Sequence, residues 1–161
     1  MKHLFITVFM LVAVIAQAQI KTKSEYQIGK IGLTQPTEVV VRILTIDGVV
    51  DKLCVFQMSH QPALVTAITE VELETMLRKI DEIKIGNMDL NSDYFEKSFT
   101  ILTTNGFVEI GYYIKTKLDA TKGQQWFIKI KDGIYEGTTF ASQMDIYKML
   151  GKTRTKMQSI Q

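Results

Sequence analysis

The sequence predicts an α+β fold, in which two similar β-hairpin/helix units form an antiparallel sheet with helices packed on one face. A nine-residue pattern occurs twice, as ILTIDGVVD at residues 43–51 and as ILTTNGFVE at residues 101–109. Each copy is centred on an Asp-Gly or Asn-Gly pair, which favours a tight turn between two strands. A helical pattern follows each copy, at residues 69–79 and 142–152. We therefore expect a tandem duplication.

The composition is that of one globular domain. Of the 161 residues, 46% are hydrophobic and 22% are charged, which is sufficient for a single core. We expect this domain at residues 19–161, with unit one at about 38–86 and unit two at about 97–152. The net charge of +2 is too small to indicate a nucleic-acid surface. Cys54 is the only cysteine, which excludes an internal disulfide and a multi-cysteine metal site, and we expect no metal and no cofactor.

The first 18 residues have the pattern of a secretory signal peptide. Lys2 precedes an apolar run at residues 4–15, and Ala16-Gln17-Ala18 then provides the small residues that a signal peptidase recognises. The run is too short for a membrane anchor, which needs about 20 apolar residues. We therefore expect export to a periplasm or to the medium, with the membrane only as the export route.

The first hairpin is predicted together with its register. Residues 38–46 and 49–58 are rich in β-branched side chains, and a two-residue turn at Asp47-Gly48 places Val41 opposite Cys54. This register puts Cys54 on the core face. A thiol there is a poor nucleophile, because burial disfavours its charged form.

The outer face of this hairpin is a candidate interaction face, because it is apolar where the second hairpin is polar. Its six aliphatic side chains would form a patch on the order of a few hundred Å². We expect the irregular strand at residues 26–33 to cover it, with a partner protein or a second copy of the chain as the alternative. On the same face, Arg42 and Asp51 lie diagonally and are expected to pair. The candidate interaction residues are Val40, Leu44, Ile46, Val49, Leu53 and Val55.

A helix is expected after a connector at residues 59–68. The connector contains His60, which we interpret as a solvated loop residue because no metal ligand or catalytic partner is near it in the sequence. Thr69 and Glu72 have the spacing of a capping box, and an apolar stripe at three- and four-residue intervals follows them. Gly86 is suited to end the helix.

The loop after this helix resembles a calcium-binding pattern only superficially. Asp89, Asn91 and Asp93 alternate as calcium ligands do. However, Tyr94 stands where such a loop needs glycine, and Thr100 where it needs a bidentate glutamate. We expect an ordinary helix-to-strand connection.

The second unit is predicted by the same reasoning. A two-residue turn at Asn105-Gly106 would pair Ile101 with Ile110. Residues 126–130 alternate as a strand does, and Asp132-Gly133 indicates a turn into a short return strand.

Ser142 and Asp145 have capping-box spacing and begin the second helix. Gly151 is expected to weaken or end it. Residues 152–161 are then expected to form a frayed basic tail.

Three functions agree with these features. An exported, non-catalytic binding or interaction protein is the first, with a protein partner or a homo-oligomer as its partner. A structural subunit of an envelope assembly is the second. A carboxylate-dependent hydrolase is the third and least supported, because the sequence contains no Gly-x-Ser-x-Gly motif and no cluster of candidate ligands.

We predict cleavage after Ala18, which would leave Gln19 at the mature N-terminus. Intact-mass measurement of the protein from its native source, allowing for cyclisation of the new N-terminal glutamine, checks this. A mature protein that retains residues 1–18 would contradict it.

Overall fold

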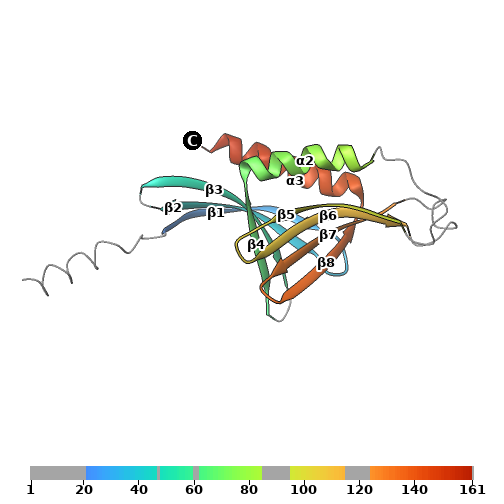
Figure 1. Ribbon diagram of the computed structural model, residues 1–161. Coiled ribbons are helices and arrows are strands. Elements are labelled where there is room, and N and C mark those ends of the chain that lie inside the picture. The colour runs from blue at the N-terminus through green and yellow to red at the C-terminus, as the bar shows by residue number, and fades with distance from the viewer. Residues whose placement is uncertain (1–20, 47, 60–61, 85–94, 115–123, 161) are drawn as a thin grey trace, which may run out of the picture.

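The computed structural model describes residues 21–46, 48–59, 62–84, 95–114 and 124–160. Within them the fold is α+β, with two four-stranded antiparallel sheets and two helices (Figure 1). The strands therefore form two sheets, where the sequence predicted one. The expected signal segment, His60 and the residues compared with a calcium loop before Phe95 lie outside the described residues.

The first sheet has the order β1-β2-β3-β4, so each strand is bonded to its neighbour in the sequence. Register shifts in β1, at Thr22/Ser24 and at Gln27/Gly29, make it the irregular strand expected in this region. The segment predicted as a connector, residues 59–68, contains most of a fourth strand, β4. The six residues of β4 are too few for their alternation to be recognised so close to Pro62. The four strands are β1 (Lys21–Ile31), β2 (Thr37–Ile46), β3 (Val49–Met58) and β4 (Leu64–Thr69).

The second sheet has the order β5-β6-β7-β8. Its last hairpin follows the expected glycine signal, because Asp132 pairs with Tyr135 and Gly133 has a φ of 60° in the turn between them. The four strands are β5 (Phe95–Leu102), β6 (Gly106–Ile114), β7 (Gln125–Asp132) and β8 (Tyr135–Ala141).

The predicted register of the first hairpin is confirmed. Val41 pairs with Cys54 and Val40 with Val55. Gly48 has a φ of 81°, a conformation that glycine adopts without steric cost. Cys54 is buried and belongs to the hydrophobic core.

The predicted register of the second hairpin is wrong by two residues. Ile101 pairs with Val108, not with Ile110, because three residues, 103–105, connect β5 to β6, and the Thr103 N–H donates to the Gly106 carbonyl oxygen across the turn. Gly106 was predicted to lie in the turn, but in the structure it allows close approach of β7. A Cβ atom there would lie 2.0 Å from the Lys131 carbonyl oxygen, so β6 and β7 approach closely only because this residue is glycine. Since the error is an even number of residues, the predicted core face is still the core face.

The nine-residue pattern occupies different positions in the two sheets. Its first copy connects the second and third strands of its sheet, and its second copy connects the first and second strands of the other.

Both capping boxes form. The Thr69 N–H donates to Glu72 at 2.7 Å at the start of α2 (Glu70–Lys84), and the Asp145 N–H donates to Ser142 Oγ at 3.1 Å at the start of α3 (Gln143–Ser159). α3 does not end at Gly151 but continues to Ser159, so the frayed tail predicted from residue 152 is wrong.

The residues predicted as a frayed tail continue α3 because they have a core face. Thr153 and Met157 are fully buried, and the Thr153 hydroxyl donates to the Met149 carbonyl oxygen. The Lys52 ammonium donates to the Met157 and Ile160 carbonyl oxygens, where the positive charge complements the helix C-terminus. Burial and capping outweigh the cost of one helical glycine, which is about 1 kcal/mol.

Each helix contacts strands of the sheet that belongs to the other half of the chain. α2 follows the first sheet in the chain but contacts β5 and β6 as well as β3 and β4, whereas α3 follows the second sheet and contacts β1, β2 and β3. The two helices lie side by side over the sheets (Figure 1). One hydrophobic cluster contains side chains from both sheets and both helices, so the described chain has a common core.

Two close contacts join the sheets directly. The buried hydroxyls of Thr37 and Thr139 lie 2.6 Å apart, and Thr139 Oγ1 also donates to the Gln35 carbonyl oxygen. Gly137 lets β8 lie against the first sheet, because a Cβ atom there would be 2.4 Å from Met58 Sδ.

We predict that Gly106→Ala lowers the free energy of unfolding by about 1–3 kcal/mol, since the new methyl group would meet backbone atoms that cannot rotate away. Gly151→Ala is the control. Its Cβ would meet nothing within 4 Å inside a helix, and we expect it to raise stability by about 0.5–1 kcal/mol. Urea denaturation measures both. Equal effects of the two substitutions would contradict the close approach.

Candidate functional site

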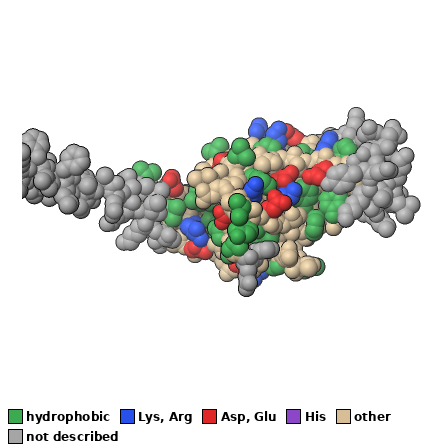
Figure 2. All heavy atoms as spheres, turned by 60° about the horizontal axis from the view of Figure 1, so that its bottom comes forward, with side chains coloured by type: hydrophobic (Ala, Val, Ile, Leu, Met, Phe, Trp, Pro, Cys, Tyr) green, Lys and Arg blue, Asp and Glu red, His purple; other side chains and the backbone are tan. Residues whose placement is uncertain are grey.

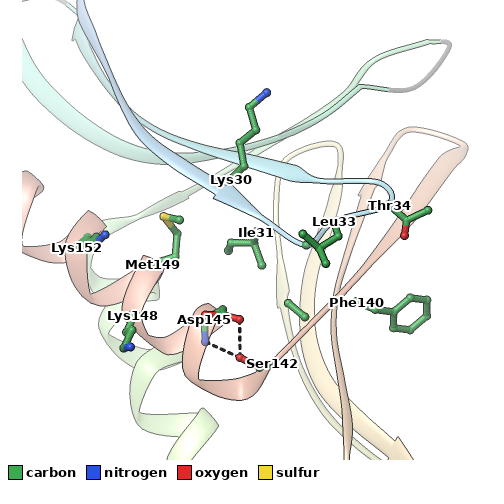
Figure 3. Close-up of a pocket in the computed structure, with 12 residues that line it drawn as sticks. Lys30, Ile31, Leu33, Thr34, Phe140, Ser142, Asp145, Lys148, Met149 and Lys152 are labelled. Atoms are coloured by element: carbon green, nitrogen blue, oxygen red, sulfur yellow. Dashed lines mark hydrogen bonds between the residues drawn. The ribbon is translucent and has the colours of Figure 1, made fainter.

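A cleft of about 550 Å³ lies between the turn after β1, the end of β8 and the first half of α3 (Figure 3). Gly32 turns the chain at its edge with a φ of 84°, and a Cβ atom there would lie 2.3 Å from Thr139 Cγ2. The contact between the sheets thus positions one wall, and Ser142 begins α3 at the other. The cleft is lined by Lys30, Ile31, Gly32, Leu33, Thr34, Phe140, Ala141, Ser142, Asp145, Lys148, Met149 and Lys152.

One part of the lining is apolar. Ile31 is buried at the base, and Met149 and Leu33 lie on either side of it (Figure 3). The side chain of Leu33 is 98% exposed and that of Phe140 is 46% exposed. Leu33 therefore presents hydrophobic surface to solvent at the edge of the cleft, whereas the Phe140 ring points away from it in Figure 3 and packs edge-on against Tyr113, with the ring centroids 5.9 Å apart.

The rest of the lining is mainly basic, with three lysines and one aspartate. The ammonium of Lys30 lies 2.6 Å from Glu38, and in Figure 3 its side chain points away from α3. Lys148 and Lys152 lie one turn apart on α3 and are exposed. Among the described residues neither of them has an ion-pair partner within 4.0 Å, which leaves two positive charges at this end of the cleft.

The first turn of α3 is closed by its own cap. Ser142 Oγ accepts a hydrogen bond from the Asp145 N–H and donates one to the Asp145 carboxylate at 2.6 Å. Positive potential available to a ligand therefore comes from the lysine side chains.

The interaction face predicted on the first hairpin is divided in the structure. Val40 and Val55 are 3% and 0% exposed, Leu44 and Leu53 are half-buried, and Val49 is 62% exposed. The side chain of Ile46 lies outside the described set. The six residues therefore do not form one exposed patch.

Charged pairs explain why the middle of this face is enclosed. The Lys30–Glu38 and Arg42–Glu25 ion pairs flank Val40 in the register, and their aliphatic stems lie along its face. Arg42 thus pairs with Glu25. The pairing of Arg42 with Asp51 that the sequence predicted is wrong. The segment expected to cover the face instead extends the sheet as β1.

A second cleft, of about 350 Å³, lies at the exposed end of the first hairpin, against the first turn of α2. Val50 and Leu53 line it from β3, and Val71, which is 76% exposed, lines it from α2. Beyond the pairing of Leu53 with Thr69, β3 has no partner on the β4 side within the described chain.

Exposed hydrophobic side chains also occur away from both clefts. Leu102 ends β5, and Ile134 lies in the β7–β8 turn. Figure 2 views the protein from the side of this turn and shows hydrophobic side chains beside basic and acidic ones. These positions provide matched controls for substitutions in the clefts.

Burial or a close hydrogen bond shifts the pKa of a few ionisable groups away from the ordinary value. Burial raises the pKa of the Cys54 thiol far above its ordinary value, which keeps the thiol neutral. A hydrogen bond from Lys79 lowers the pKa of Glu82. Among the described residues, no three His, Cys, Asp or Glu side chains are close enough to hold a metal ion.

Comparison of the chain with known protein families, characterised proteins and solved structures finds no significant match. Neither helix in the described ranges combines the length and the apolar character needed to cross a membrane.

The sequence did not predict the cleft beside α3. Leu33 was assigned to an irregular strand, and Lys152 to a frayed tail. The basic spacing at Lys148 and Lys152, four residues apart on a helix, was the available signal. It has meaning only once β1 and β8 are known to meet at this helix.

Proposed function

We propose that this chain is an exported, non-catalytic binding protein that holds a small molecule in the cleft beside α3. The observation that carries the proposal is the cleft itself. Its volume of about 550 Å³ and its apolar lining with a few charged groups are typical of small-molecule sites. Export rests on the signal pattern of residues 1–18.

The exposure of Leu33 supports this role. A leucine that is 98% exposed gains nothing from the hydrophobic effect in the free protein. A ligand in the cleft would remove part of this surface from water, at about 25 cal/mol per Å² of apolar area. Leu33 would thereby contribute to binding without contributing to folding.

We predict that the wild-type protein binds Nile red, a neutral hydrophobic dye, and that Leu33→Asp weakens this binding about fivefold. Fluorescence titration measures it. Ile134→Asp, at an equally exposed position outside the cleft, is the control and should leave the affinity unchanged. Thermal melting should show both variants folded. Equal affinities of the two variants would place the dye elsewhere.

A second function, as a subunit of an assembly, is favoured by the exposed end of the first hairpin. Val50 and Val71 expose aliphatic surface in the second cleft, and beside it lies the edge of β3 that has no partner among the described residues. Adjacent exposed aliphatic side chains and an open strand edge are features of protein interfaces. The occupant we propose is a second copy of the chain.

We predict that Val50→Lys shifts the protein from dimer to monomer in sedimentation velocity, because it places a charge in the interface. Leu102→Lys is the control, since this residue is also an exposed aliphatic at a strand end, and it should leave the dimer intact. A wild-type protein that is monomeric at every soluble concentration would exclude this interface.

We further propose that the two halves arose by duplication. The order of four strands followed by a helix, which occurs twice, supports this. The nine-residue pattern does not, because its copies connect non-equivalent strands.

A further inference from the structure

The charge distribution of the cleft beside α3 restricts the chemistry of its ligand. We infer, building on the proposed function, that the ligand is a free amphipathic anion, with one acidic group on an apolar body. Two features support this inference: the unpaired lysines at one end of the cleft and the apolar strip across the rest of it.

The lysines define the position of the acidic group. Lys148 and Lys152 are separated by one helical turn, so both ammonium groups can reach one anionic group between them. The acidic residue of the lining, Asp145, is hydrogen-bonded to Ser142 at the start of the helix. An anion between the ammonium groups of Lys148 and Lys152 would form charge-assisted hydrogen bonds with them, which are shorter and stronger than neutral ones.

The apolar strip defines the remainder of the ligand. Met149, Ile31 and Leu33 follow one another across the cleft from the lysine end (Figure 3). A compact anion such as acetate would reach the lysines and leave this strip in water. A neutral apolar molecule would cover the strip but remove water from the lysines without replacing their hydrogen bonds.

The test uses displacement of Nile red from the wild-type protein by three probes, each kept below its aggregation limit. Decanoate carries both features, decanol lacks the charge and acetate lacks the apolar body. We expect decanoate to bind about tenfold more tightly than decanol, a difference that salt reduces, and acetate not to displace the dye.

The double variant Lys148→Gln/Lys152→Gln should lose most of the preference for decanoate and keep its affinity for decanol. The matched control, Met144→Glu/Tyr147→Glu, makes the same change in net charge on the same helix at two exposed positions outside the cleft lining. It should keep the preference. Equal loss in both variants would show that only the net charge acts, and would overturn the site.

The outcomes separate this inference from the proposed function. If decanol and decanoate bind equally, the cleft is a binding site and the anion inference is wrong. If no probe binds and Nile red affinity does not depend on Leu33, the proposed function fails as well. Flotation with anionic lipid vesicles, together with failure of free decanoate to compete, would identify a membrane surface and would also overturn a free ligand.

Discussion

The contact of α3 with the first sheet is the constraint on which the rest of the structure depends. α3 follows the second sheet in the chain but contacts β1, β2 and β3, where Ile146, Leu150 and Met157 are fully buried. Lys52 binds its C-terminal carbonyl oxygens, so the helix is fixed to the first hairpin at one end and to β8 at the other. Neither sheet can complete its core without elements from the other half of the chain.

The same arrangement creates the cleft. α3 begins directly after β8 and packs against β1. The cleft is the space left between the first turns of α3, the turn after β1 and the end of β8. The base of the cleft is fixed by the Thr37–Thr139 hydrogen bond and by Gly32, which admits Thr139 where any side chain would collide with it. The walls of the cleft are thus set by buried contacts, while Leu33 at its edge takes little part in the core. A substitution at the exposed edge of the cleft can therefore change the site without removing a core contact.

Local chemistry predicted most of the fold and little of the site. The Asp47-Gly48 turn set one register correctly, because that turn depends only on the residues within it, and both capping boxes formed for the same reason. Asn105-Gly106 misled because the glycine is required by Lys131 on another strand. The extension of α3 past Gly151 and the pairing of Arg42 with Glu25 depend on neighbours distant in sequence. The cleft is formed by the turn after β1, the end of β8 and α3, which are distant in sequence, so no local pattern predicts it.

The crossed position of α3 also determines the order in which the protein can be completed. Lys52 and the helix carbonyl that it binds are separated by 105 positions, and α3 is synthesised after every strand that it covers. Contacts between such distant residues slow folding, because the intervening chain must lose its freedom before they form. Until Met157 has been synthesised, the apolar faces of β1 and β2 lack their cover. The nascent chain therefore stays incompletely folded until α3 has been synthesised, and two apolar strand faces remain open to solvent for that time.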